Sequence, residues 1–119
     1  MENFYDRTER LLGKDAIEEI AKLHIVVLGV GGVGSWCCEN LARMGVGELS
    51  LVDFDTIEPS NINRQVHALQ STLGQNKTET MKKRMLDINP DIIVHTYQEK
   101  ITPEQLPKCL LQGDYTIDC

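Results

Sequence analysis

A glycine-rich stretch, VVLGVGGVGSW at residues 26–36, constrains the fold of this chain more than any other feature. It follows a run of branched aliphatic residues and precedes a segment with helical spacing. Its glycines are Gly29, Gly31, Gly32 and Gly34. A glycine turn between a buried strand and a helix commonly binds a phosphate, because free backbone N–H groups and the positive end of the helix point at the ligand. The stretch alone is equally compatible with a turn that serves packing.

Strand and helix patterns alternate along the 119 residues. Buried strands are predicted at 23–29, 48–54, 91–97 and 114–119. The alternation predicts an α/β, Rossmann-like fold: a mostly parallel sheet with flanking helices. We expect residues 1–22 to form an N-terminal helical segment and 23–119 a nucleotide-binding domain that is incomplete at its C-terminus. The chain stops within the fourth strand or at its end, so we expect a truncated fold, either part of a longer protein or half of a tight assembly.

Two helices are expected to pack on this sheet through apolar stripes. In the helix after the glycine turn, the stripe consists of Val33, Cys37, Leu41 and Met44. In the helix within QNKTETMKKRMLDINP, it consists of Met81, Met85 and Ile88, and Asn89 and Pro90 end the helix.

The cysteines show neither the C-x-x-C spacing of a zinc site nor the density of a disulfide scaffold. They are Cys37, Cys38, Cys109 and Cys119. We therefore expect reduced thiols and no metal ligands, with Cys37 packing as a small apolar residue.

Charge and hydropathy exclude other classes of protein. No stretch approaches the ~20 apolar residues of a membrane span, and the charged N-terminus lacks the apolar centre of a secretory signal. We therefore predict a cytoplasmic chain without a membrane partner. The net charge of −6 argues against broad binding to a nucleic acid backbone, although a nucleic acid could still dock on a local basic patch.

Residues after the second strand point to ATP. Asp53 ends that strand roughly 20 residues beyond the glycines, where a carboxylate can accept hydrogen bonds from both ribose hydroxyls, although it could also be a turn former. Asn61, Arg64 and Gln65 follow, and Lys77 opens the next helix. Two cations beside a sugar-binding carboxylate favour an enzyme in which the α-phosphate of ATP is attacked and pyrophosphate leaves, because they stabilise the charge that grows on the phosphate oxygens. A nicotinamide dehydrogenase has no need of these cations.

Four motifs, in order, carry a resemblance over nearly the whole chain. They are GVGGVGSW, LVDFDTIEPSNINRQVHA, LGQNKTETMKKRMLDINP and YTIDC. Together they resemble the MoeB, ThiF and ubiquitin-activating enzyme (HesA/MoeB/ThiF) superfamily. GGVGSW joined to NINRQVHAL is most similar to the branch that dehydrates threonylcarbamoyladenosine in tRNA. The resemblance implies adenylation of a carboxylate by ATP and Mg²⁺, in a homodimer whose substrate is tRNA.

The resemblance also implies roles for individual residues. Gly32 contacts the nucleotide, Asp53 the ribose, and Arg10 reaches the triphosphate of the neighbouring protomer. The predicted catalytic residues are Arg64, Lys77 and, in trans, Arg10. The predicted nucleotide-binding residues are Gly29, Gly31, Gly32, Gly34, Asp53, Asp55, Asn61, Arg64, Gln65 and Lys77. No residue is predicted to bind metal, because the aspartate that serves the magnesium triphosphate in the family lies two residues beyond the equivalent of Cys119.

Three alternatives remain open from the sequence. The carboxylate could be the C-terminus of a ubiquitin-like sulfur carrier, with that carrier or a desulfurase-related protein as partner. The chain could be a nucleotide-binding module without activity, or a nicotinamide oxidoreductase, which leaves Arg64 and Lys77 unexplained.

Of the other polar residues, Trp36 is expected to pack near the glycine turn and His67 to be a hydrogen-bonded loop histidine. Asp55 and Glu58 could form a solvated face.

Overall fold

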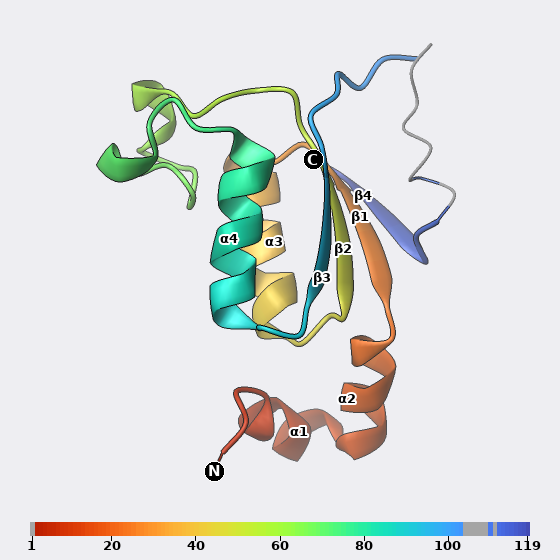
Figure 1. The fold of residues 1–119 in the computed structure, drawn as a ribbon. Helices are drawn as coiled ribbons and strands as arrows, with labels where there is room; N and C mark the ends of the chain where they lie inside the picture. The colour runs from red at the N-terminus through yellow and green to blue at the C-terminus, as the bar shows by residue number, and fades with distance from the viewer. Residues whose placement is uncertain (1, 104–109, 111) are drawn as a thin grey trace.

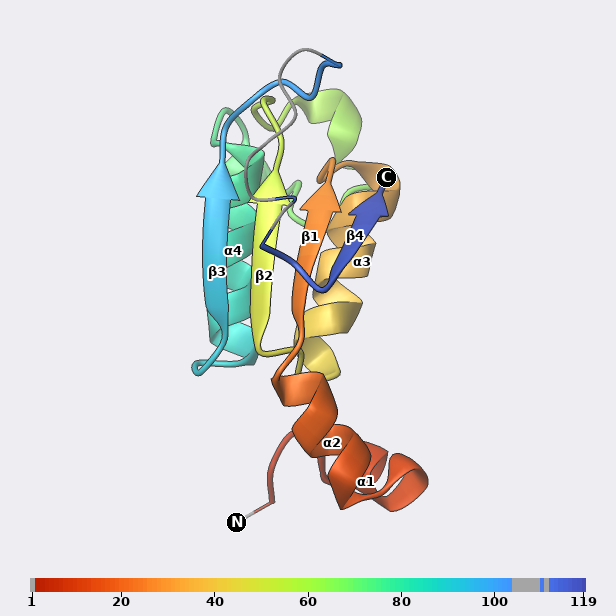
Figure 2. The same ribbon diagram turned by 90° about the vertical axis from the view of Figure 1, so that its right-hand side faces the viewer.

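A four-stranded parallel sheet organises the computed structural model, which describes residues 2–103, 110 and 112–119. Its strands are β1 (His24–Leu28), β2 (Glu48–Val52), β3 (Ile93–Tyr97) and β4 (Tyr115–Asp118). The spatial order is β3-β2-β1-β4, and every neighbouring pair is parallel (Figure 2). This arrangement confirms the predicted α/β fold, with strands slightly shorter than the sequence pattern indicated.

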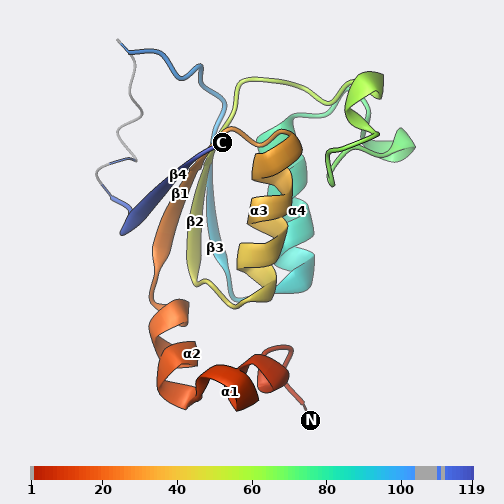
Figure 3. The ribbon, with the colours of Figure 1, turned by 180° about the vertical axis from the view of Figure 1, so that it is seen from behind.

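The helices cover one face of the sheet and extend beyond both ends of its strands. Helices α3 (Gly32–Arg43) and α4 (Lys77–Ile88) cover one face (Figures 1 and 3). The predicted N-terminal helices, α1 (Asp6–Leu12) and α2 (Lys14–Ala21), lie beyond the amino ends of the strands (Figure 1). Two short 3₁₀ helices, η1 (Pro59–Asn61) and η2 (Gln70–Thr72), belong to the β2–α4 connection at the carboxyl ends. Among the described residues, none of the helices is long and apolar enough to cross a membrane.

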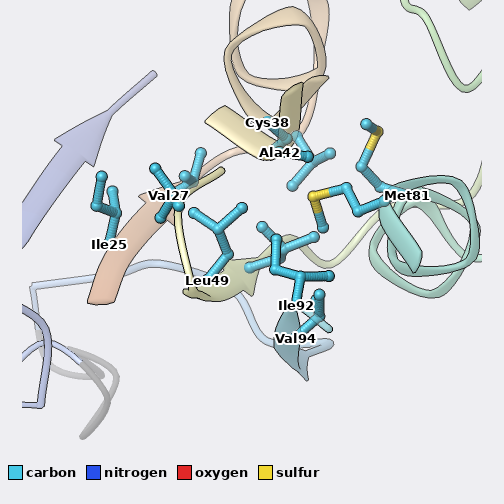
Figure 4. Packing of buried hydrophobic residues seen from close by; sticks show 12 residues of the cluster. Ile25, Val27, Cys38, Ala42, Leu49, Met81, Ile92 and Val94 are labelled. Carbon is cyan, nitrogen blue, oxygen red and sulfur yellow. The ribbon is translucent and has the colours of Figure 1, made fainter. Parts of the chain in front are cut away.

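The main core lies between the sheet and the two covering helices (Figure 4). Branched aliphatic side chains of the strands meet small and sulfur-containing side chains of the helices. They include Val27, Leu49 and Val94 from the sheet, Cys38 and Ala42 from α3, and Met81 and Met85 from α4. The stripe predicted for α4 is therefore confirmed, with Ile88 packed at its margin and Asn89 following the last helical residue.

The stripe predicted for α3 was wrong for its two ends. Val33 is 73% exposed and Met44 is 42% exposed. Leu41 packs only partly against the core, and Cys37 is half-buried, whereas its neighbour Cys38 is fully buried. The buried residues of α3 are Gly34, Ser35, Cys38, Glu39 and Ala42. An apolar pattern misses this face because three of its residues are buried for reasons other than hydrophobicity.

Glu39 is a buried carboxylate that ties α3 to α4. It accepts hydrogen bonds from Nε of Arg43 at 2.9 Å and from two nitrogens of the Arg84 guanidinium. Burial opposes ionisation, but the hydrogen bonds and charges of the two arginines outweigh it and hold the pKa of Glu39 below its ordinary value. The pair of helices that covers the sheet is therefore joined by an ionic contact as well as by the core.

The opposite face of the sheet has two zones. A smaller apolar cluster lies toward the carboxyl ends and consists of Val26, Leu28 and Val52, with Tyr97 and Leu110 packed against it. Polar side chains lie toward the amino ends, where His24 bonds Ser50 at 2.7 Å and His95 bonds Glu48 at 2.6 Å. These polar pairs lie at the other end of the strands from the glycine turn.

Candidate nucleotide-binding site

The four glycines of the turn between β1 and α3 have two different roles. Gly29 has a φ of 91°, which L-residues with side chains rarely adopt. A Cβ on Gly34 would lie 1.8 Å from the carbonyl oxygen of Gly29, so only glycine lets α3 start so close to the strand. At Gly31 and Gly32 a Cβ would meet only side-chain atoms of Gln65 and Arg64, at 3.6–3.7 Å. The first pair is therefore required by the fold, whereas the second pair leaves backbone accessible beside polar side chains.

Val30, in the middle of this turn, is fixed from two sides. Its N–H donates to Oδ2 of Asp53 at 2.7 Å, and its carbonyl oxygen lies 2.7 Å from Nε2 of His67. Oδ1 of Asp53 accepts from the N–H of Asp55 at 2.8 Å. Asp53 is thus a turn former, as one interpretation of the sequence held. Each carboxylate oxygen retains capacity for a second hydrogen bond, so its contact with a ribose stays a prediction.

His67 is a hydrogen-bonded loop histidine, as predicted, and it is also buried. It is 1% exposed, and burial lowers its pKa, with the nearby Lys77 charge acting in the same direction. The hydrogen bond to Val30 opposes this shift. A neutral ring that bonds a carbonyl through Nε2 must carry its proton there. Nδ1 has no hydrogen-bond partner among the described residues.

Asn61 and Gln65 are buried, and both contribute to this end of the sheet. Oδ1 of Asn61 accepts from the N–H of Glu58 at 2.8 Å, which closes η1, so Glu58 belongs to a cap. Gln65 is 6% exposed, and its Nε2 lies beside Gly31. Its Oε1 is buried and has no hydrogen-bond partner within the described part of the chain. The amide of Gln65 therefore retains an acceptor next to the glycine turn.

Arg64 is exposed, and its backbone is anchored to α3. Nε1 of Trp36 donates to the carbonyl oxygen of Arg64 at 2.9 Å, which confirms that Trp36 packs near the turn. The guanidinium donates to the carbonyl oxygen of Ser60 at 2.9 Å and to Oδ1 of Asn63 at 3.0 Å. Its aliphatic stem lies next to Gly32. The charge is thus held over the part of the turn where backbone is accessible.

Lys77 is the first residue of α4, and its side chain is 7% exposed. Nζ lies 4.0 Å from Oδ2 of Asp55, whose own side chain is 69% exposed. Asn76 caps the helix by accepting from the N–H groups of Thr78 and Glu79. A buried ammonium whose counter-ion is distant and solvated is incompletely compensated. The structure therefore presents a cation able to receive an anionic ligand.

Two adjoining hollows, of about 340 and 240 Å³, run along the carboxyl ends of the strands. Both are bordered by Phe54 and Asp55, so they adjoin each other and together make up the depression at this edge of the sheet. The larger is lined by Asn61 and Lys77, and the smaller by Gly29 and Asp53. The side chain of Asp55 thus lines this depression while most of its surface stays exposed to solvent. Ligands of open α/β sheets bind in this position.

The sequence analysis missed two residues of this depression. Phe54 is 52% exposed and directly follows Asp53, and Nζ of Lys100 lies 5.3 Å from the centre of its ring. A large exposed aromatic residue beside a predicted ligand carboxylate was the available signal. Lys100 follows the end of β3 by three residues, so its place just after a predicted strand was the available signal.

Arg10 lies apart from the other predicted site residues. It is exposed on α1, beyond the amino ends of the strands, whereas the glycine turn lies at the carboxyl ends (Figure 1). Its surroundings are Asp6, Glu9 and Lys14. The structure therefore does not bring Arg10 to the site of its own chain.

The depression fits Mg²⁺ bound together with phosphates. Among the described residues, no group of three or more His, Cys, Asp or Glu side chains could hold a metal ion. Mg²⁺ does not need such a group, because it is usually bound through one or two carboxylates, substrate phosphates and water. The solvated carboxylate of Asp55 is of that type and lies at the rim beside Lys77.

Comparison with known proteins identifies the family. The model of the ThiF family matches residues 5–119. The chain belongs to the ThiF family. This ThiF-family chain is 46% identical over 110 residues to the tRNA threonylcarbamoyladenosine dehydratase of Haemophilus influenzae, covering 92% of this chain and 42% of that protein. It is 35% identical over 105 residues to the molybdopterin-synthase adenylyltransferase of the same organism, covering 88% of this chain and 43% of the relative.

A solved structure supports the same placement. The crystal structure of the E. coli tRNA N6-threonylcarbamoyladenosine dehydratase, TcdA, in complex with ATP has a TM-score of 0.92 and 41% identity, covering 96% of this chain and 47% of that one. The chain therefore spans less than half the length of the relatives it matches.

Proposed function

We propose that this chain is the ATP-binding part of an enzyme that adenylates a carboxylate, and that residues 23–119 form that part while 1–22 form a separate helical segment. The observation that carries the proposal is the position of Lys77. Its buried ammonium lines the larger of the two adjoining hollows, Asp53 and Gly29 line the smaller, and its counter-ion is 4.0 Å away. A polyanionic nucleotide supplies the compensation that this cation lacks.

Each residue then has a task that its geometry supports. Backbone at Gly31 and Gly32 approaches the phosphates, where the start of α3 favours negative charge. Arg64 and Lys77 stabilise the charge that grows on phosphate oxygens as the carboxylate oxygen attacks the α-phosphorus and pyrophosphate leaves. Asp53 accepts the ribose hydroxyls through the acceptor capacity left by its two backbone bonds. Mg²⁺, when bound, neutralises the leaving pyrophosphate.

The carboxylate is, in this proposal, the threonylcarbamoyl group on adenosine 37 of tRNA. The support is the higher identity to the dehydratase, 46%, than to the adenylyltransferase, 35%, over nearly the same residues. A nucleophile of the same molecule then attacks the carbonyl carbon of the adenylated carboxyl group and displaces AMP, which closes a ring. No cysteine nucleophile is needed for this sequence of steps.

A second candidate is adenylation of the C-terminus of a ubiquitin-like sulfur carrier. The observation that favours it is the relation to molybdopterin-synthase adenylyltransferases, at 35% identity. Exchange of labelled pyrophosphate into ATP, measured on the protein with tRNA carrying threonylcarbamoyladenosine and, separately, with a sulfur carrier, distinguishes the two. Exchange that depends on the tRNA supports the dehydratase, and exchange that depends on the carrier supports the second candidate.

ATP binding by this chain is tested directly by calorimetry in the presence of Mg²⁺. We expect ATP to bind more tightly than NAD, because both nucleotides offer a ribose to Asp53 but only the triphosphate uses both Arg64 and Lys77. Equal or tighter binding of NAD would refute the assignment to ATP. Binding of ATP without pyrophosphate exchange would assign the chain to the inactive nucleotide-binding modules.

Arg10 is proposed to act in a homodimer. It lies at the far end of the sheet from its own site, so only a second copy could bring it to a triphosphate. Random mixing of Arg10→Ala and Lys77→Ala proteins should restore about a quarter of the exchange activity, because half of the dimers are hybrids with one intact site. Hybrids that form but stay inactive would show that Arg10 is not shared.

A further inference from the structure

Two thiols meet beside the glycine turn and have no role in the proposed reaction. Cys37 lies on α3, and Cys119 follows β4, which places them 82 positions apart in sequence. Both are free cysteines, and each side chain lies close enough to the other to perturb its pKa. Cys119 is exposed and Cys37 is half-buried.

The backbone fixes this encounter independently of the thiols. The N–H of Cys119 donates to the carbonyl oxygen of Leu28 at 2.9 Å, which holds the end of β4 beside the end of β1. Cβ of Cys119 lies 3.4 Å from the position that a Cβ on Gly34 would take. Gly34 and Cys37 are three residues apart on α3 and therefore share a face of the helix. Cys37, in the second turn of α3, thus lies on the side of the helix that faces Cys119.

We propose that Cys37 and Cys119 form a reversible disulfide that couples the redox state of the chain to the conformation of its glycine turn. The chemistry requires a small-molecule disulfide, such as oxidised glutathione, as oxidant. The thiolate of Cys119 attacks one sulfur of that disulfide and expels the first small thiol. Cys37 then loses its proton, attacks the sulfur of Cys119 and expels the second. The two protein thiols lose two electrons and two protons, and the small disulfide gains them as two thiols.

Exposure decides the order of these steps. Cys119 is the more accessible of the two. Burial and the adjacent Asp118 raise the pKa of Cys119, and the interaction with the Cys37 side chain offsets this only in part. Because the thiolate is the attacking species, the exchange becomes faster as the pH rises.

The disulfide affects the glycine turn because Cys119 already lies in close contact with that turn. The carbonyl oxygen of Cys119 lies 2.7 Å from where a Cβ on Gly29 would stand. A covalent S–S bond is much shorter than a contact between two thiols, so its closure draws the end of β4 onto α3 and displaces the turn. The effect on ATP rests on the proposed function, whereas formation of the bond does not. We expect the affinity for ATP to fall about tenfold on oxidation.

The test uses the chain with Cys109, which lies outside the described residues, replaced by serine. After incubation with oxidised glutathione, intact mass should show the loss of two hydrogen atoms, and peptide mapping should join Cys37 to Cys119. Calorimetry should show weaker ATP binding that a dithiol reductant restores. In Cys37→Ser the glutathione adduct on Cys119 should persist. In Cys38→Ala, a matched control on the same helix, the disulfide should still form.

The outcomes separate the two proposals. Failure of the disulfide to form, or its formation through Cys38, overturns the thiol pair. A disulfide that forms without changing ATP affinity overturns the coupling to the turn. Absence of ATP binding by the reduced chain contradicts the proposed function, while the mass data still decide the thiol pair.

Discussion

The close approach of Gly34 to Gly29 allows a quantitative prediction for Gly34→Ala. The new methyl group would lie 1.8 Å from the carbonyl oxygen of Gly29, so helix and strand would have to separate by about 1.6 Å to reach ordinary contact at 3.4 Å. The obstacle is backbone, which cannot turn aside as a side chain can. Overpacking of this kind costs about 1–3 kcal/mol, and the helix gains at most about 1 kcal/mol from replacing glycine.

We therefore expect Gly34→Ala to lower the free energy of unfolding by about 2 kcal/mol, which is the upper end of the overpacking range, about 3 kcal/mol, less the helix gain of about 1 kcal/mol. Urea denaturation followed by circular dichroism measures it. Gly32→Ala is the matched control, because its methyl group would contact only the Arg64 side chain, at 3.6 Å and beyond. This control should keep its stability within about 0.5 kcal/mol but weaken ATP binding. Equal stability of the two variants would refute the division of the glycines into structural and ligand-facing pairs.

Three further predictions concern buried polar groups. Glu39→Gln should reduce the free energy of unfolding at neutral pH by about 1–2 kcal/mol, a modest loss because the arginine partners of Glu39 are partly solvated. The native protein should lose this contribution as the pH falls through the lowered pKa of Glu39, whereas the variant should not. Acid titration of the unfolding midpoint measures the difference. His67→Phe should weaken ATP binding more than His67→Gln, because the glutamine amide can still donate to the carbonyl oxygen of Val30. Comparable ATP affinities of the two variants by calorimetry would show that this hydrogen bond does not determine ATP binding. Lys77→Met should abolish ATP binding without unfolding the chain, and native affinity would show that its charge is not used.

The sequence predicted the sheet, the order of its elements and the stripe of α4, because each depends on local patterns of apolar residues. It also placed Asp53, Asn61, Gln65 and Lys77 correctly at the carboxyl ends of the strands, since parallel strands bring those ends together. The buried face of α3 could not be predicted in the same way. Glu39 is buried through partners on α4, and Gly34 through a contact with a turn, so neither follows from hydrophobic spacing.

The contacts that complete the site were the least accessible to sequence reasoning. The bond between Trp36 and Arg64 and the stacking of Lys100 on Phe54 join segments that are distant in sequence. No periodicity links such residues, and only the folded topology brings them together. Arg10 lies apart from the site, and its action on a second copy stays a prediction.

The two hydrogen bonds of Val30 have a consequence for local opening of the molecule. They join three segments: the turn after β1, the end of β2 at Asp53, and the loop that ends at His67. Neither the turn nor that loop can open without breaking a buried bond to the other. The amide of Val30 donates to Asp53, so it should exchange with solvent deuterium only when the turn separates from the end of β2, at a free energy close to that of opening the sheet at this end.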